Sequence, residues 1–303
     1  MVPESIRVFG IPMDLGQQRR GVDMGPSAIR YAGLKPELAR LGAQVHDAGN
    51  INVPVREQLD ESDRVAGGLN AFFLHQNAAI CQAAYDRITT ELGRDEVGVF
   101  LGGDHSMSIG TVSAMASRGE TGLLWIDAHG DFNTPESSPS GNIHGMALAA
   151  LVGDGPPELT GIGYPGQKVQ PHNIAMIGVR DLDAEERRRL TRSGITVYTM
   201  REVDEIGMYA AAKKILDRFA YMDAIHVSLD LDACDPRLAP GVGTPVIGGL
   251  TYREAHLLME TLASSQKIRS VDVVEINPIL DTQNRTARYA VEFVASLLGK
   301  RIM

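Results

Sequence analysis

Residues 121–133 read TGLLWIDAHGDFN, and this stretch decides the class of fold. The apolar run TGLLWI has the composition of a strand that is buried on both faces of a sheet. Side chains that bind metals follow it at every second position: Asp127, His129 and Asp131, with Asn133 after them. In an open α/β sheet, ligands bind in the crevice beyond the carboxyl ends of the strands. The stretch is therefore typical of an α/β protein with a polar site at a strand end.

Short apolar runs bounded by Gly, Pro, Asp or Asn recur along the whole chain. They predict eight strands, at residues 5–13, 42–53, 96–103, 122–130, 173–181, 194–200, 223–232 and 271–280. Segments with helical spacing lie between most of these runs, at residues 26–42, 65–93, 209–220 and 251–264. Strands that alternate with helices imply crossover connections. We therefore expect an α/β fold of three layers, with a mostly parallel eight-stranded sheet flanked by helices.

The composition is that of a globular protein: of 303 residues, 44% are hydrophobic and 22% are charged. A net charge of -9 gives no basic surface for nucleic acid, so we expect no such partner. The sequence has no apolar stretch of about 20 residues and no signal-peptide pattern, which favours a cytoplasmic protein without a membrane anchor. No linker divides the chain, so we expect a single domain over residues 1–303. Cys81 and Cys234 lie far apart and fit reduced thiols.

Ligand-type side chains gather at the ends of four of the predicted strands. They are Asp104 and His105, then Asp127, His129 and Asp131, then Asp230, Asp232 and Asp235, and lastly Glu275. Carboxylates repel one another strongly in a poorly solvated crevice, so such a group requires raised pKa values or a cation. Carboxylates mixed with imidazoles favour Mn, Mg, Fe or Zn, and there are enough ligands here for two ions. Two ions about 3.5 to 4 Å apart would hold a bridging hydroxide as a nucleophile.

Some of these residues have a simpler interpretation. An aspartate after a strand is often a helix cap or a turn residue, and we favour that role for Asp104 and Asp235. The spacings D-x-H-x-D and D-x-D on two strand ends are harder to explain by capping. Four histidines that lie outside these ligand-rich strand ends are expected to lie on the surface or to be satisfied inside the protein: His46, His75, His172 and His256. We expect His226, within a predicted strand, to be a core residue or a support for the ligands.

Several motifs, taken in order, resemble the arginases of the ureohydrolase family. They are GGDHS (102–106), DAHGDFN (127–133), SPSGNIHGM (138–146), SLDLDACDP (228–236), GTPVIGGLTYRE (243–254) and VEINP (274–278). The similarity begins at GIPMDLGQQRRGVDMGPSAIR (10–30) and covers nearly the whole chain. It is closest to the bacterial type of arginase, and it implies the arginase-like fold.

The resemblance implies two Mn²⁺ ions and the hydrolysis of L-arginine to L-ornithine and urea by a hydroxide that bridges them. The residues that match the family's ligands are His105, Asp127, Asp131 and Asp230 for one ion, and His129, Asp127, Asp230 and Asp232 for the other. Asp127 and Asp230 would bridge the two ions. A bridging hydroxide is needed because a guanidinium group is a poor electrophile that stays protonated at ordinary pH.

The resemblance also implies roles for residues around the metals. Asp131 would orient the hydroxide, His144 would shuttle the proton to the leaving amine, and Glu275 would hold the guanidinium group. The positions that match contacts to the amino acid are Asn133, Ser138 and Ser140 for the α-carboxylate, Asp183 for the α-amino group, Glu186 through a water, and Thr244 at the guanidinium end. A solvated carboxylate in the first turn of a helix is an equal alternative for Glu186.

The sequence departs from the family pattern at two positions and leaves alternatives for the oligomer and the function. Position 138 is Ser where animal arginases carry Thr, and Cys234 is either a small packed side chain or a thiol sensitive to oxidation. Family subunits form trimers or hexamers, so we expect a homo-oligomer in which Arg253 and Glu254 lie at an interface. The rival functions are agmatinase, another guanidino-group ureohydrolase, and a metal-dependent regulatory relative without catalysis. The donors of SPSGNIHGM argue against the first two, and the complete ligand set argues against the third.

Overall fold

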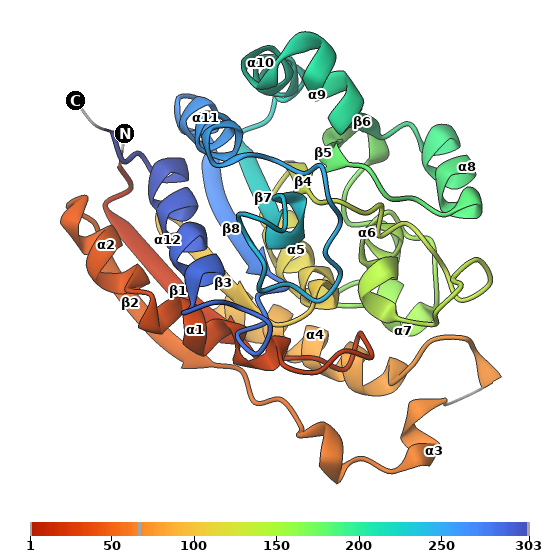
Figure 1. Cartoon of the computed structure of the whole chain (residues 1–303). Coiled ribbons are helices and arrows are strands. Elements are labelled where there is room, and N and C mark those ends of the chain that lie inside the picture. Colours follow the sequence, from red (N-terminus) through yellow and green to blue (C-terminus); the bar gives the residue numbers. More distant parts are fainter. Residues whose placement is uncertain (1, 66–67, 302–303) are drawn as a thin grey trace.

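The computed structural model describes residues 2–65 and 68–301, and within them the chain builds one eight-stranded sheet (Figure 1). The strands are β1 (Ser5–Ile11), β2 (Gln44–Asn50), β3 (Val97–Gly102), β4 (Thr121–Ile126), β5 (Ile174–Val179), β6 (Thr196–Thr199), β7 (Ala224–Asp230) and β8 (Ile268–Val274). Their order in the sheet is β2-β1-β3-β8-β7-β4-β5-β6, and every pair is parallel. The predicted fold class is confirmed.

Helices cover both faces of this sheet (Figure 1). In the described residues they are α1 (Gly25–Tyr31), α2 (Leu34–Arg40), α3 (Glu61–Arg64), α4 (Leu74–Glu91), α5 (Ser108–Ala116), α6 (Ala147–Leu151), α7 (Pro157–Thr160), α8 (Ala184–Ser193), α9 (Met200–Ile206), α10 (Met208–Arg218), α11 (Tyr252–Ala263) and α12 (Arg285–Leu297). Helices α1, α2, α9, α10, α11 and α12 contribute to the core on one face, and α4, α5, α6, α7 and α8 to the core on the other.

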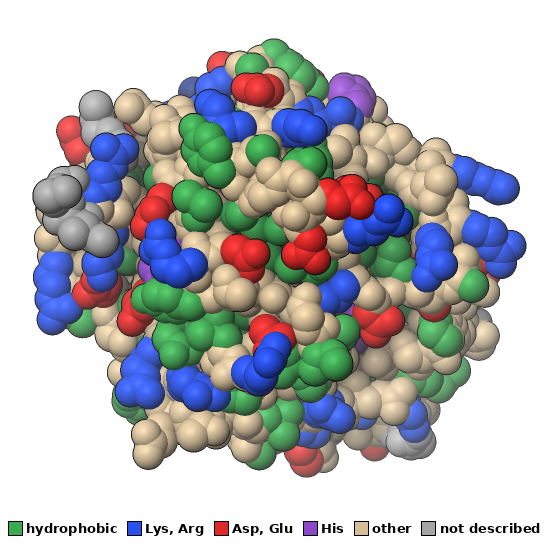
Figure 2. All heavy atoms as spheres, turned by 45° about the horizontal axis from the view of Figure 1, so that its top comes forward, with side chains coloured by type: hydrophobic (Ala, Val, Ile, Leu, Met, Phe, Trp, Pro, Cys, Tyr) green, Lys and Arg blue, Asp and Glu red, His purple; other side chains and the backbone are tan. Residues whose placement is uncertain are grey.

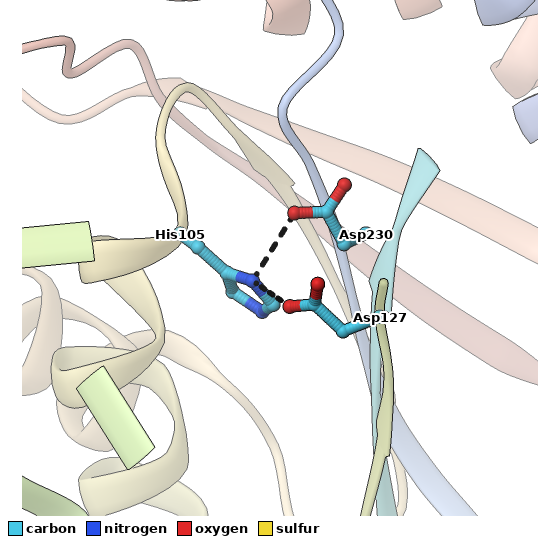
Figure 3. A group of neighbouring side chains, drawn as sticks. All are labelled: His105, Asp127 and Asp230. Carbon is cyan, nitrogen blue, oxygen red and sulfur yellow. Dashed lines mark ion pairs between the residues drawn. The ribbon is translucent and has the colours of Figure 1, made fainter. Parts of the chain in front are cut away.

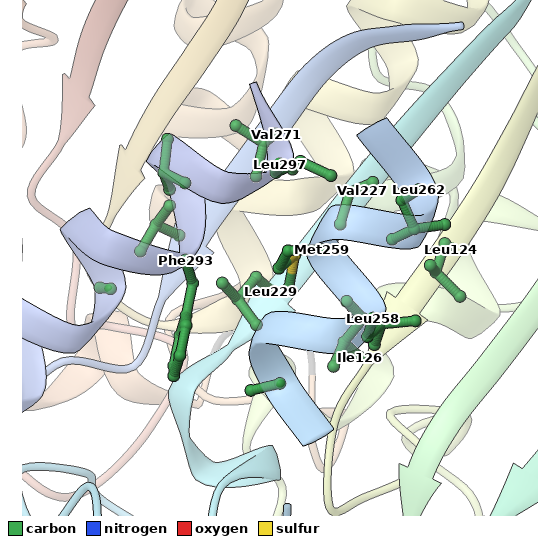
Figure 4. Close-up of a cluster of buried hydrophobic side chains, with 14 of the residues drawn as sticks. Leu124, Ile126, Val227, Leu229, Leu258, Met259, Leu262, Val271, Phe293 and Leu297 are labelled. Atoms are coloured by element: carbon green, nitrogen blue, oxygen red, sulfur yellow. The ribbon is translucent and has the colours of Figure 1, made fainter. Parts of the chain in front are cut away.

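The alternation of side chains along each strand explains these two cores. On β4, Leu124 and Ile126 pack against the α11 side, where Figure 4 shows them near Leu258, whereas Leu123 and Trp125 belong to the opposite core. All four side chains are fully buried. A strand covered on both faces must be apolar at every position, which is why its sequence is a continuous apolar run.

The strand order brings the polar strand ends together. β3, β8, β7 and β4 are consecutive neighbours at the centre of the sheet, although β3 and β4 are consecutive in sequence and β7 and β8 follow much later. The connection after β3 therefore skips two places, which makes this the point where the strand order reverses. Parallel sheets bind their ligands in the crevice at such a point. The four strands whose ends carry ligand-type residues are these same four.

Some predicted boundaries differ from the structure. The predicted helix at 26–42 is two helices, because Gly33 between them has a φ of 92°, a left-handed conformation that interrupts the helical hydrogen bonds. The predicted helix at 65–93 includes residues 66–67, which lie outside the described residues, and the described helix α4 begins only at Leu74. β4 ends at Ile126, earlier than predicted, so Asp127 is the first residue beyond the strand.

The surface carries both signs of charge. On the face shown in Figure 2, Lys and Arg side chains are interspersed with Asp and Glu side chains. In the parts of the chain that the structure describes, no helix combines the length and the apolar character that crossing a membrane requires.

Candidate metal centre and adjoining pocket

Two groups of histidine and aspartate side chains lie at the carboxyl ends of the central strands. The first comprises His105, Asp127 and Asp230, and the second comprises Asp127, His129 and Asp232. Within each group, one potential ligand atom from every residue lies within 4.8 Å of the others, and Asp127 belongs to both groups. The sequence predicted that these residues would come together, and the structure places them together.

The first group is organised around one nitrogen atom of His105 (Figure 3). His105 Nδ1 lies 3.0 Å from Asp127 Oδ2, 3.0 Å from Asp131 Oδ2 and 3.3 Å from Asp230 Oδ2. The side chain of His105 is 1% exposed, and those of the three aspartates are at most 7% exposed. Three carboxylates that face one buried nitrogen form a site for a positive charge.

The second group is more open to solvent. His129 Nδ1 lies 3.4 Å from Asp127 Oδ1 and 3.1 Å from Asp232 Oδ2, and the His129 side chain is 24% exposed. Its other ring nitrogen lies 4.0 Å from the exposed carboxylate of Asp181. Asp127 Oδ2 faces His105 and Asp127 Oδ1 faces His129, so Asp127 lies between the two groups.

Local contacts fix Asp127 and His105. Trp125, the only tryptophan of the chain, donates a hydrogen bond from Nε1 to Asp127 Oδ2 at 3.0 Å. Its ring also stacks on the imidazole of His105, with ring centres 4.0 Å apart. The sequence analysis missed this role, because a tryptophan in an apolar run is ordinarily only a core residue.

The donor set fits a divalent cation. His105 Nδ1 and Asp131 Oδ2 are buried and have no hydrogen-bond partner among the described residues. Burial and the charge of Asp127 raise the pKa of Asp131 to about 6. Burial and the charges of its aspartate neighbours also raise the pKa of Asp230. Burial lowers the pKa of His105, but the surrounding carboxylates outweigh it and the net shift is upward. A bound cation would resolve these shifts by supplying the missing positive charge.

A histidine and glutamate pair lies beside the metal ligands. His144 Nδ1 is 3.1 Å from Glu275 Oε1, which also accepts a hydrogen bond from the backbone N–H of His105 at 3.0 Å. Burial opposes protonation of His144, but the hydrogen bond and the charge of Glu275 prevail, so the pKa of His144 is raised to about 9. His144 therefore holds a proton at neutral pH.

The second oxygen of Glu275 is occupied by a residue that the sequence analysis missed. Gln17 donates a hydrogen bond from Nε2 to Glu275 Oε2 at 2.7 Å, and Gln17 is 3% exposed. The loop that carries it is anchored nearby, because Gly16 N–H donates to Asp104 Oδ2 at 2.8 Å. Gln17 lies 258 residues from Glu275 in the sequence, and a lone glutamine in a loop gives no local signal of such a contact.

A pocket of about 460 Å³ adjoins both groups of ligands. Its lining includes predicted metal ligands and all the predicted substrate contacts except Glu275: His129, Asp131, Asn133, Ser138, Ser140, His144, Asp183, Glu186, Asp230, Asp232 and Thr244. His105, Asp127 and Glu275 do not contribute to that lining and are at most 1% exposed. Both oxygens of Glu275 are already hydrogen-bonded, as described above.

Hydrogen bonds hold the pocket residues in place. Asp183 caps α8 by accepting from the backbone N–H groups of Glu185 and Glu186, and its other oxygen accepts from Asn133 Nδ2 at 2.9 Å. Ser138 Oγ accepts from the backbone N–H of Gly141 at 2.9 Å and lies 3.5 Å from Ser140 Oγ, so at least one of these two hydroxyl protons can be donated to a ligand. The irregular loop and the start of α8 thus form one connected wall.

Glu186 and Thr244 complete the pocket. Glu186 lies in the first turn of α8 but is only 5% exposed, so the alternative of a solvated carboxylate is wrong. It accepts a hydrogen bond from the backbone N–H of Phe132 at 2.9 Å, and burial raises its pKa to about 8. Thr244 Oγ1 donates to Asp232 Oδ2 at 2.9 Å, which ties the loop after β7 to the second group of ligands.

The simpler interpretations hold for several other residues. Asp104 caps the turn that begins at His105, and Asp235 accepts hydrogen bonds from Arg237 and Gly248. Cys234 is 1% exposed and burial raises its pKa to about 12, so its thiol is a packed side chain with little reactive thiolate.

Comparisons with known proteins show which family and which solved structures this chain is similar to. The chain matches the model of the Arginase family over residues 4–299. It is 49% identical to the arginase of Bacillus caldovelox, with 98% of this chain and 99% of that protein covered, and 46% identical to the arginase of Bacillus subtilis, with 99% of each covered. The crystal structure of the Bacillus caldovelox arginase at pH 5.6 superposes with a TM-score of 0.94 over the whole of both chains, at 47% identity.

Proposed function

Because the chain belongs to the arginase family of enzymes, which act on a guanidino C–N bond, we propose that it hydrolyses L-arginine to L-ornithine and urea with two Mn²⁺ ions as cofactors. The observation that carries the proposal is the pair of histidine and aspartate groups that share Asp127. This pair opens onto a pocket whose lining includes both hydrogen-bond donors and carboxylates.

The residues that would hold the ions are the two groups described above together with Asp131, whose carboxylate faces His105 at 3.0 Å. In the proposed ligand sets, Asp127 and Asp230 would each contribute to both ions. When bound, the ions supply a hydroxide nucleophile at neutral pH and offset the charge of the aspartates. Imidazole and carboxylate ligands suit Mn²⁺, although they suit other divalent ions as well.

The pocket fits the two charged groups of a free amino acid. Ser138 and Ser140 have hydroxyl protons to donate, and Asn133 has an amide group, so this side of the pocket suits an α-carboxylate. Asp183, at the N-cap of α8, and Glu186, in its first turn, also line the pocket and suit an α-amino group. The aspartates at the inner end of the pocket would attract the positively charged guanidinium group.

The chain's own residues also prepare the proton transfers. Asp131 orients the nucleophile by accepting a hydrogen bond from it. His144, which holds a proton at neutral pH, donates that proton to the leaving amine as the C–N bond breaks. Glu275 stabilises the protonated imidazole by accepting from Nδ1 at 3.1 Å. The role of Glu275 toward the substrate guanidinium stays a prediction of the resemblance.

The test is urea release by chelator-stripped protein, with and without added Mn²⁺, on L-arginine and agmatine in parallel. The proposal expects Mn²⁺-dependent urea from arginine and at least a hundredfold less from agmatine, which lacks the carboxylate. Activity on agmatine alone would assign the chain to the agmatinase alternative. Mn²⁺ binding without urea from either substrate would favour a regulatory relative.

A further inference from the structure

A cluster of polar side chains is buried on the far side of His105 from the pocket. Ser228 lies on β7, Asp272 on β8, and Ser108 and Thr111 on α5, and each of these residues is 0% exposed. None of them lines the pocket, and the proposed reaction uses none of them. Buried polar groups reduce stability unless they are hydrogen-bonded, so this cluster requires a reason.

The cluster forms a continuous path of hydrogen bonds from His105 to a carboxylate. His105 Nε2 lies 2.8 Å from Ser228 Oγ, and Ser228 Oγ lies 3.3 Å from Ser108 Oγ. Ser108 Oγ donates to Asp272 Oδ2 at 2.6 Å. The path therefore begins at the ring nitrogen that faces away from the metal ligands and ends inside the sheet.

Counting protons along this path gives each hydrogen bond a direction. A carboxylate only accepts, so the single proton of the Ser108 hydroxyl is committed to Asp272. Ser108 Oγ can then only accept from Ser228, which commits the proton of Ser228 in turn. Ser228 Oγ must consequently accept from His105, so the proton of the imidazole sits on Nε2.

In the neutral imidazole this direction leaves the lone pair of Nδ1 facing the three carboxylates, which is the arrangement that a metal ion requires. We propose that Ser108 and Asp272 are positioning residues for the metal centre: through Ser228 they hold His105 in the tautomer and orientation that ligate a cation with Nδ1. The inference rests on the proposed function, because it assumes that His105 is a metal ligand.

Thr111 provides a matched control inside the same cluster. Its hydroxyl donates to the same oxygen, Asp272 Oδ2, at 2.9 Å, and it lies on the same helix as Ser108. His226 also approaches this oxygen, with Nε2 at 3.1 Å. Thr111 is not between Asp272 and Ser228, however. Removing either hydroxyl deletes one donor to Asp272, but only the loss of Ser108 interrupts the path to His105.

The experiment measures the affinity of the full-length protein for Mn²⁺ by competition with a chelating dye, for the wild type, Ser108→Ala and Thr111→Val. Without Ser108, the hydroxyl of Ser228 is free to turn and donate to His105 Nε2, which favours a proton on Nδ1 where the ion should bind. We expect the affinity of one of the two Mn²⁺ sites to weaken about tenfold in Ser108→Ala, and the affinity of both to change less than about twofold in Thr111→Val.

Equal losses in the two variants, or an unchanged affinity in Ser108→Ala, would overturn the inference. If Ser108→Ala does not fold, Ser108→Cys replaces it, since a thiol has nearly the same shape but is a weaker donor. A several-fold loss of affinity is then expected, and none would again overturn the inference. The wild-type titration distinguishes failure of this inference from failure of the proposed function. If the wild type binds no Mn²⁺, the proposed metal centre itself is contradicted.

Discussion

Gln17→Met tests whether the loop before α1 supports the proton donor of the site. Methionine has nearly the same length as glutamine but cannot donate a hydrogen bond. The substitution removes the 2.7 Å contact to Glu275 Oε2 and leaves the two contacts to Oε1, from the backbone of His105 and from His144 Nδ1. The carboxylate of Glu275 then keeps its charge but loses one of the contacts that fix its rotation.

The magnitude follows from the type of contact. A hydrogen bond to a charged group contributes about 1.5 to 3 kcal/mol, and each 1.4 kcal/mol in the activation barrier changes the rate about tenfold. If the whole of this hydrogen-bond free energy were lost from the transition state, kcat would fall by roughly ten- to a hundredfold. Because Oε1 of Glu275 keeps both donors, we expect a value near the lower end. Gln17 does not line the pocket, so KM for arginine should change less than about twofold.

The assay is urea release at saturating Mn²⁺ over a range of arginine concentrations, with kcat and KM determined separately. Gln18→Met is the matched control, because Gln18 is the exposed neighbour of Gln17 and its substitution should leave both constants unchanged. The Mn²⁺ content of each variant shows whether the metal centre is intact. A normal kcat in Gln17→Met, or a rise in KM alone, would refute the argument that Gln17 acts on His144 through Glu275.

Three further outcomes are expected. Asp183→Ala removes the cap of α8 and the contact to Asn133, so thermal unfolding should show a loss of about 1 kcal/mol and kinetics should show a raised KM for arginine; an unchanged KM would contradict the assignment of this wall to the amino acid. The pKa of His144 is raised to about 9, so in metal-free protein its contribution to the free energy of unfolding should be complete below about pH 6.5 and lost as the pH rises through 9. Denaturant unfolding of the wild type and His144→Asn should show a larger difference in the free energy of unfolding at pH 6 than at pH 10. A difference that does not depend on pH would argue against the charged pair of His144 and Glu275. Chelation should lower the unfolding temperature and Mn²⁺ at a hundred times its Kd should restore about 2.7 kcal/mol, while no shift would mean that the ion does not bind the folded state.

The layers of the fold could be predicted from the sequence because burial on both faces leaves a continuous apolar run. β4, with all its positions buried, illustrates the case in which composition alone identifies the element. Edges and breaks are harder to predict. β2 lies at the edge of the sheet and none of its residues is buried, and the strand predicted at 42–53 spans only Gln44–Asn50. The break at Gly33 depends on a positive φ that the helical spacing around it does not reveal.

The histidines and aspartates that the structure groups at the strand ends could be predicted to lie together because such side chains are chemically unusual there. The residues that support them could not. Trp125, Gln17 and Ser108 are ordinary in their local sequence. The stacking of Trp125 on His105 and the contacts of Gln17 to Glu275 and of Ser108 to Asp272 arise only because the strand order brings separate segments together. A contact between residues 17 and 275 depends on the whole topology, and no local pattern encodes it.

Two residues of the site have backbone conformations that their residue types do not predict. Asp131 and Glu275 have φ values of 48° and 64°, in the left-handed region that glycine adopts most easily. Such a conformation costs about 1 to 3 kcal/mol at each position, so the fold must hold it from outside. For Glu275 the backbone N–H donates to the carbonyl of Gly103 at 2.8 Å, and the carboxylate accepts from His105 and Gln17. A glycine would relieve the backbone there but would remove the carboxylate that holds His144. The strain at Glu275 is therefore explained by the position of its side chain, and the surrounding contacts that offset the strain are the same contacts that orient the carboxylate toward His144.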